Sequence, residues 1–213
     1  MTFIDIHTHR DTRHPDILSV LNLFPEDVHK ITETGLYSLG IHPWYVQNAD
    51  IRIVAENAQK KQILAIGEIG LDKLKPDWDL QIELFKAQLR LAKEQNLPVI
   101  LHCVKAFEEV LSILKSENFT NQVIFHRFGG HINLARQLIE KGYFLSFGQI
   151  LFNSKSKTRN AFQKIPLSSV FLETDDSEIS IQEIYAQASA LKSISIDNLK
   201  AEIHINLGRF IKI

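Results

Sequence analysis

The sequence predicts an α/β protein folded as a (β/α) barrel of the TIM type, trimmed or distorted, with seven clear strands. Short apolar runs alternate with amphipathic segments, an order typical of parallel strands joined by helices. The runs are FIDI (3–6), LYSLGI (36–41), ILAIG (63–67), PVIL (98–101), QVIF (122–125), YFLSF (143–147) and SVFL (169–172). The eighth strand of a complete barrel is not obvious. The 213 residues fall short of the roughly 250 typical of this fold.

Apolar residues recur at helical spacing between these runs. The segments that show this spacing are 82–92, 107–114, 134–138, 181–191 and 203–207. Asp197 is the expected N-cap of the last helix. An open nucleotide-binding sheet is the competing architecture, but it usually has a glycine-rich turn after its first strand. Here that turn reads HTHRDTRHP and contains no glycine, which favours the barrel.

Composition narrows the function classes. The formal net charge is -1, so no global basic field recruits nucleic acid or an anionic membrane. Cys103 is the single cysteine, which excludes an intrachain disulfide. No apolar run approaches the roughly 18 residues of a membrane span. We therefore expect a cytoplasmic protein with one domain over residues 1–213, no membrane association and no obligate protein partner.

Metal-ligating side chains close most of the apolar runs. They are His7, His9, His42, Glu68, His102, His126 and Asp175. In a parallel barrel the carboxyl ends of all strands share one face, which holds the active site. His7 and His9 are two residues apart on a strand and therefore point the same way. A lone histidine at a strand end is more often structural, but this ordered set favours a metal site.

Imidazole nitrogens and carboxylate oxygens bind divalent metals. Four histidines with Glu68 and Asp175 exceed the needs of one tetrahedral ion. The set suits two ions about 3.5–4 Å apart with a bridging carboxylate. We expect zinc, manganese or magnesium.

At these residues the chain resembles the TatD-like metal-dependent deoxyribonucleases of the amidohydrolase superfamily. The matching pieces keep the family's order and span nearly the whole chain. They are IDIHTH (4–9), GIHP (40–43), AIGEIGLD (65–72), FKAQLRLAKEQNLPVILH (85–102), HRFGG (126–130), YFLSFG (143–148), ETD (173–175) and NLGRF (206–210).

The resemblance implies a role for each matching ligand. His7, His9 and Asp175 bind one ion, His102 and His126 bind the other, and Glu68 bridges the pair. It also implies that His42 lies near the substrate phosphate. The chain departs from the family pattern at Val104, where an arginine is usual, and at Arg127, where a small residue or cysteine is usual. It also lacks the family's longer segment after the ETD motif, which puts substrate length in question.

The expected reaction is hydrolysis of a phosphodiester bond by metal-activated water, with Glu68 and Asp175 as catalytic residues and Asp175 as proton acceptor. The substrate is DNA or a smaller phosphodiester. Its expected contacts are Trp44 and three cations of the segment NSKSKTR (153–159), namely Lys155, Lys157 and Arg159.

Two alternatives stay open. One is an amidohydrolase acting on a small cyclic amide or ester. Many such enzymes bridge their ions with a carboxylated lysine, whereas Glu68 fills that place here. The other is a metal-binding relative without turnover, which the shortened late segment suggests.

Overall fold

The strands of the protein follow one another in the sheet in chain order. The computed structural model describes residues 1–11, 14–47 and 49–211. The eight strands form one sheet in the order β1 to β8, and the named pairings are parallel. They are β1 (Phe3–Thr8), β2 (Ile17–Leu23), β3 (Leu36–Leu39), β4 (Ile63–Asp72), β5 (Val99–Val104), β6 (Val123–Phe125), β7 (Phe144–Phe147) and β8 (Val170–Leu172).

The two ends of this order meet. Thr8 of β1 forms a parallel bridge with Asp175, three residues after β8. The His9 amide donates to the Asp175 carbonyl at 3.2 Å, and the Asp175 amide donates to the His7 carbonyl at 3.0 Å. Eight parallel strands in chain order, with the first joined to the segment after the last, confirm the predicted (β/α) barrel class.

The count of seven strands is wrong by one, because β2 (Ile17–Leu23) was not expected. Its sequence ILSVLNL carries Ser19 and Asn22, which interrupt the apolar pattern. In the structure Asn22 is buried, and its side-chain oxygen accepts a hydrogen bond from the Ser38 hydroxyl at 2.9 Å. A satisfied polar residue can therefore occupy a buried strand position that a hydropathy pattern rejects.

Seven α-helices occur in the described chain. They are α1 (Ile51–Ala58), α2 (Trp78–Glu94), α3 (Phe107–Ser116), α4 (Ile132–Glu140), α5 (Lys157–Lys164), α6 (Ile181–Lys192) and α7 (Ile196–Phe210). Five were expected, and α1 and α5 are additions. Short 3₁₀ segments span Pro25–Lys30 (η1), Gln149–Phe152 (η2) and Leu167–Ser169 (η3).

Asp197 is not the N-cap of α7. Ser195 takes that position, and its hydroxyl accepts from the Asn198 amide at 3.2 Å. Asp197 lies in the first turn instead, where a negative charge interacts favourably with the helix dipole. Both residue types suit a cap, so the sequence leaves the boundary open by two residues.

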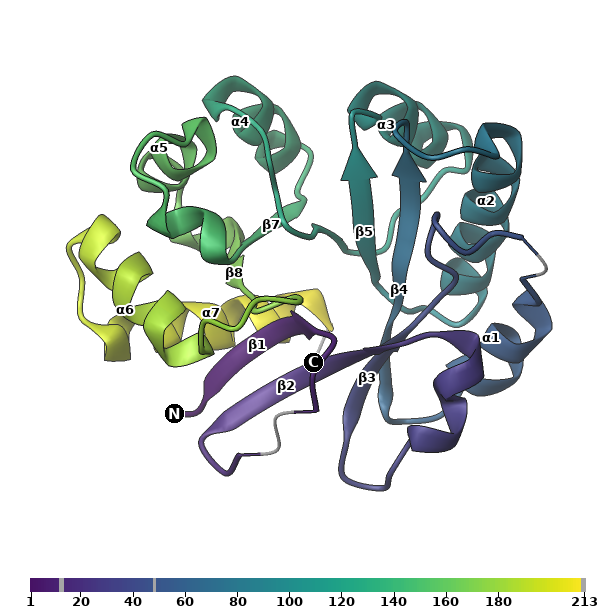
Figure 1. Ribbon diagram of the computed structural model, residues 1–213, viewed down its shortest axis with the longest axis horizontal. Helices are drawn as coiled ribbons and strands as arrows, with labels where there is room; N and C mark the ends of the chain where they lie inside the picture. Colours follow the sequence, from purple (N-terminus) through teal and green to yellow (C-terminus); the bar gives the residue numbers. More distant parts are fainter. Residues whose placement is uncertain (12–13, 48, 212–213) are drawn as a thin grey trace. The chain divides into compact units, whose positions relative to one another are not determined.

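The chain divides into two compact units. The terminal unit comprises residues 1–21 and 124–213, and the central unit comprises residues 22–123. In the central unit α2 packs on β4 and α3 packs on β5 (Figure 1). In the terminal unit α6 and α7 contact β1, the strand that carries His7 and ends just before His9 (Figure 1). A single domain over residues 1–213 stays a prediction.

None of the helices in the described part of the chain combines the length and the apolar character needed to cross a membrane.

Candidate metal centre

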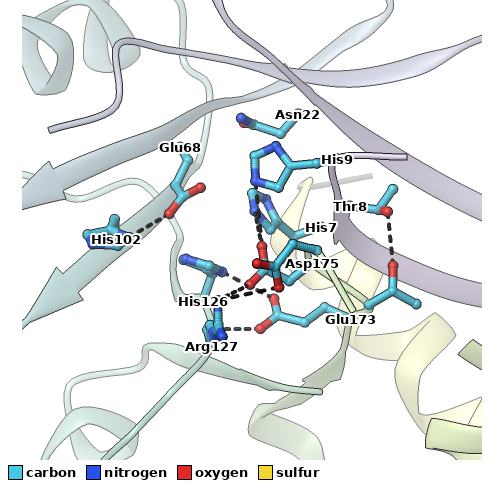
Figure 2. A network of polar contacts seen from close by, with 12 residues as sticks. His7, Thr8, His9, Asn22, Glu68, His102, His126, Arg127, Glu173 and Asp175 are labelled. Carbon is cyan, nitrogen blue, oxygen red and sulfur yellow. Dashed lines mark hydrogen bonds and ion pairs between the residues drawn. The ribbon is translucent and has the colours of Figure 1, made fainter. Parts of the chain in front are cut away.

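Strand β1 carries His7, and His9 follows one residue after its end, so both lie in the terminal unit. Ile4 and Ile6 are fully buried and alternate with the polar residues of the strand. His7 Nε2 lies 3.7 Å from Asp175 Oδ1, and His9 Nε2 lies 3.5 Å from the same oxygen. Figure 2 shows both rings directed toward Asp175. One ligand atom from each residue lies within 4.8 Å of the others, so the three form a candidate cation site.

His126 joins this group from the end of β6. Its ring centroid lies 4.4 Å from that of His7, and its Nδ1 lies 3.7 Å from Glu173 Oε2. Glu173 is fully buried and accepts from the Ser146 hydroxyl at 2.6 Å and from the Arg127 amide at 2.5 Å. Hydrogen bonds of this kind fix a carboxylate that in turn orients an imidazole. We call His7, His9, His126 and Asp175 the terminal cluster.

Two carboxyl groups of this unit have shifted pKa values. Burial raises the pKa of Asp175, although the His126 imidazole works in the opposite direction. Burial by itself would raise the pKa of Glu173 as well. There the His126 and His7 imidazoles and the Ser146 hydroxyl outweigh burial, and the pKa lies below its usual value.

The central unit contributes a second group. Strand β4 continues five residues beyond the expected run, so Glu68 lies within the strand and is buried. Glu68 Oε1 lies 2.7 Å from His102 Nδ1 on β5, a contact drawn in Figure 2, and 3.2 Å from His42 Nε2. We call His42, Glu68 and His102 the central cluster, since their ligand atoms also lie within 4.8 Å of one another.

The structure shows why the second glycine of the GEIGLD motif, Gly70, is needed. It pairs with His102 across β4 and β5 and has a φ of 140°. A Cβ at this position would collide with the His102 carbonyl oxygen. Only glycine permits this close approach without strain, and the approach brings the two strands that carry Glu68 and His102 together.

Asp72 orients the second nitrogen of His102. Its Oδ2 lies 3.3 Å from His102 Nε2 and accepts a hydrogen bond from the Trp44 indole at 2.7 Å. Burial acts to raise the pKa of Asp72. Hydrogen bonds from the Leu74 amide, the Trp44 indole and His102 outweigh it and lower the pKa. With Asp72 at Nε2, His102 directs Nδ1 toward Glu68 and His42.

Both clusters suit a divalent ion. Each offers imidazole nitrogens together with a carboxylate, the mixture that zinc and manganese accept. Four of the six predicted ligands lie in the terminal cluster, and the other two lie in the central cluster. His42 approaches Glu68 almost as closely as His102 does, so the geometry makes it a ligand candidate beside its predicted place near the substrate.

The predicted substrate contacts lie on two segments. Trp44 is half exposed, and its ring lies 5.1 Å from His42 and 5.8 Å from His102 between centroids. Lys155 and Lys157 are exposed, and Arg159 is partly exposed. Lys157 begins helix α5, so part of the expected loop is helical.

Asp5 and Thr174 form a hydrogen-bonded pair next to the terminal cluster, and of the two the sequence singles out only Asp5. The Thr174 amide donates to Asp5 Oδ1 at 2.9 Å, and the Thr174 hydroxyl lies 2.6 Å from Oδ2. Burial raises the pKa of Asp5 to about 7, although the Thr174 hydrogen bonds act to lower it. Asp5 shares the strand parity of His7, which is a usable signal, whereas Thr174 has no such signal.

The sequence is similar to a known protein family and to named relatives. A family model described as TatD related DNase matches residues 11–212, a range that begins just after the HxH pair. A protein of Haemophilus influenzae named as an uncharacterized metal-dependent hydrolase is 29% identical over 238 residues, covering 94% of this chain and 90% of that protein. The alignment is longer than this chain of 213 residues, so the chain lacks segments that the relative has.

Solved structures agree on the fold. The crystal structure of YjjV, a TatD homologue from Escherichia coli, matches with a TM-score of 0.85 and 23% identity, covering 99% of this chain and 98% of that one. A TatD family hydrolase from Entamoeba histolytica matches with a TM-score of 0.81 and 16% identity, covering 98% and 97%. At these identities the matches show the fold alone.

Proposed function

The chain belongs to the TatD related DNase family, and from this premise we propose that it is a metal-dependent hydrolase that cleaves phosphodiester bonds in DNA. The observation that carries the proposal is two sets of imidazole and carboxylate donors. The ligand atoms of His7, His9 and Asp175 lie within 4.8 Å of one another, and so do those of the central cluster. Glu68 favours a phosphodiester over a cyclic amide or ester as the substrate. Many amidohydrolases have a carboxylated lysine where this chain has a glutamate. We keep the predicted pair of ions and the bridging role of Glu68 as parts of this proposal.

Divalent ions in such a site supply activated water and neutralise charge on the phosphoryl oxygens. The residues of the chain hold and orient the participants. Asp175 accepts the proton of the attacking water at its carboxylate, beside His7 and His9. Glu173 fixes His126, and Asp72 fixes His102.

The substrate contacts complete the proposal. Trp44 offers an aromatic face to a base, although Lys75 Nζ lies 4.0 Å from its ring centroid and covers part of it. Lys155, Lys157 and Arg159 contact phosphates and compensate locally for a net charge of -1. A cytoplasmic location stays a prediction from the sequence.

A nuclease assay on single-stranded and duplex DNA tests the function. The zinc- or manganese-loaded protein is compared with Glu68→Gln, which keeps the side-chain volume and removes the charge, and with Glu56→Gln as an exposed control on α1. We expect the wild type and Glu56→Gln to cleave DNA equally. We expect Glu68→Gln to lose on the order of 10²-fold or more in rate, as when other electrostatic catalytic groups are removed.

The same preparations separate the alternatives. Cleavage of a cyclic amide or ester without DNA cleavage would identify an amidohydrolase of small substrates. Metal bound without turnover on either substrate class would identify a metal-binding relative. Equal DNA cleavage by the wild type and Glu68→Gln would trace the activity to contamination or to another site.

A further inference from the structure

Arg127 contacts one oxygen of the Asp175 carboxylate, and the histidines face the other. It follows His126 directly and has a φ of 45°. Its Nη1 donates to Asp175 Oδ2 at 2.7 Å, whereas Oδ1 faces His7 and His9. Figure 2 shows Arg127 beside Asp175 and Glu173, where the guanidinium contacts Asp175 and the main-chain amide contacts Glu173. One side of the carboxylate thus belongs to the terminal cluster and the other to Arg127.

Most of the Arg127 fork stays available. Nη1 also lies 3.6 Å from Asp176 Oδ1, but within the described residues Nε and Nη2 have no hydrogen-bond partner. The side chain is 53% exposed. The Asp175 side chain is only 10% exposed, so water reaches this ion pair mainly at the guanidinium end. The family pattern that the sequence resembles has a small residue or cysteine at this position.

Arg127 also lines a pocket that lies wholly within the terminal unit. Its volume is about 400 Å³. Apolar walls come from Phe128, Ile150 and Ile179, and polar atoms come from Gln149 and Asn153. Asp175 and Glu173 also line it. The size falls within the range of small-ligand sites, and apolar walls with a few converging polar groups are their usual composition.

We propose that Arg127 binds a substrate phosphate in this pocket and thereby selects a nucleotide-sized phosphoester end. The inference rests on the proposed function, because it names the substrate class of the same site. A guanidinium presents paired N–H donors that match two phosphate oxygens, and the contact with Asp175 holds the fork in place. The apolar walls fit the sugar and base that the phosphate carries.

The carboxylates near Arg127 affect whether the pocket can bind a phosphate. Asp175, Asp176 and Glu173 lie near Arg127 and repel an anion as long as no cation offsets them. We therefore expect the pocket to take a phosphate only in metal-loaded protein. Binding should also favour the phosphorylated ligand strongly over the nucleoside.

The test is calorimetric titration of the zinc-loaded full chain with deoxyadenosine 5′-monophosphate and with deoxyadenosine. We expect Arg127→Gln to weaken monophosphate binding about tenfold or more, as lost charge-assisted hydrogen bonds do. Arg127→Lys should weaken monophosphate binding less, because the positive charge remains although the paired N–H donors are lost. Arg136→Gln, an exposed arginine on α4, should bind as the wild type does. Zinc content and the melting temperature are measured for every variant.

Three results would overturn the inference. They are no monophosphate binding by the zinc-loaded wild type, equal binding by Arg127→Gln, and a loss of zinc in step with the loss of monophosphate. The last would mean that Arg127 acts through Asp175 alone. Because the readout is binding, a wild type that binds the monophosphate but cleaves no DNA would count against the proposed function and leave this inference standing.

Discussion

The Asp175 amide donates to the His7 carbonyl at 3.0 Å, and the Asp175 carboxylate oxygen Oδ1 lies 3.7 Å from His7 Nε2. The join between β1 and the segment after β8 and the assembly of the terminal cluster thus occur at the same two residues. Main-chain hydrogen bonds to the end of β1 therefore hold Asp175 beside His7 and His9.

Replacing Asp175 with asparagine keeps the volume and removes the negative charge that faces His7 and His9. We expect the rate of DNA hydrolysis to fall on the order of 10²–10³-fold, the cost of losing a preorganised electrostatic group. Asp79→Asn is the matched control, since its carboxylate is exposed on α2 and lies outside both clusters. Rates within twofold of each other for the two variants would contradict the role given to Asp175.

Tyr185 ties helix α6 to strand β1. Its buried hydroxyl accepts from the Ile4 amide at 3.2 Å and donates to the Ile4 carbonyl at 3.1 Å. Tyr185→Phe leaves both main-chain groups buried without this partner, so we expect the free energy of unfolding to fall by about 1–3 kcal/mol. Tyr143→Phe, at a half-buried tyrosine, should change it by less than about 0.5 kcal/mol, as substitutions away from such features do. Chemical denaturation measures the free energy of unfolding of both variants. Equal losses in the two would contradict a stabilising role for the Tyr185 hydroxyl.

Asp5 should make stability depend on pH. Burial raises its pKa to about 7, from 3.8 for the exposed group. The unfolded chain releases the proton near pH 4, whereas the folded chain keeps it to about pH 7. The stabilisation is therefore complete below pH 4 and is lost as the pH rises to 7. From pH 5 to pH 8 we expect Asp5 to lower the free energy of unfolding by about 2–3 kcal/mol.

Denaturation with EDTA at both pH values isolates this contribution. Asp5→Asn cannot titrate, so its decrease from pH 5 to pH 8 should be smaller than that of the wild type. Asp16→Asn, at an exposed carboxylate, should keep the wild-type decrease. An unchanged pH dependence in Asp5→Asn would show that other groups, such as the histidines, cause it.

Lys155 and Lys157 should contribute to the salt dependence of DNA binding. Each phosphate contact adds about 0.7–0.9 to the slope of log affinity against log salt concentration, because bound counterions are released. We expect the double variant Lys155→Gln with Lys157→Gln to reduce this slope by about one per residue. Lys141→Gln, an exposed lysine after α4, is the control. A flat slope in the wild type would indicate a substrate smaller than a DNA strand.

The sequence predicts strands best where apolar residues run without interruption, as in β1 and β4. It misses β2, because Ser19 and Asn22 look out of place until the hydrogen bond between Asn22 and Ser38 is seen. Helix α1 was also missed, although Asp50 caps it by accepting from the Arg52 amide at 2.9 Å. Its eight residues give too short a stretch for a clear helical period.

The sequence also predicts some features of the site and not others. Ligand types at strand ends follow from the sequence, because alternation and parallel strand direction bring them to one face. The supporting hydrogen bonds do not follow. Ser146 meets Glu173, and Thr174 meets Asp5, only through contacts between residues far apart in the chain. His42 approaches Glu68 for the same reason, and no spacing rule gives that distance.

Metal content tests the central claim most directly. The full chain is stripped with a chelator, loaded with zinc or manganese, desalted and measured by mass spectrometry, beside Asp175→Asn and Glu68→Gln. We predict two ions per chain in the wild type and fewer in each variant. A wild-type chain that retains no ion after desalting would contradict the account.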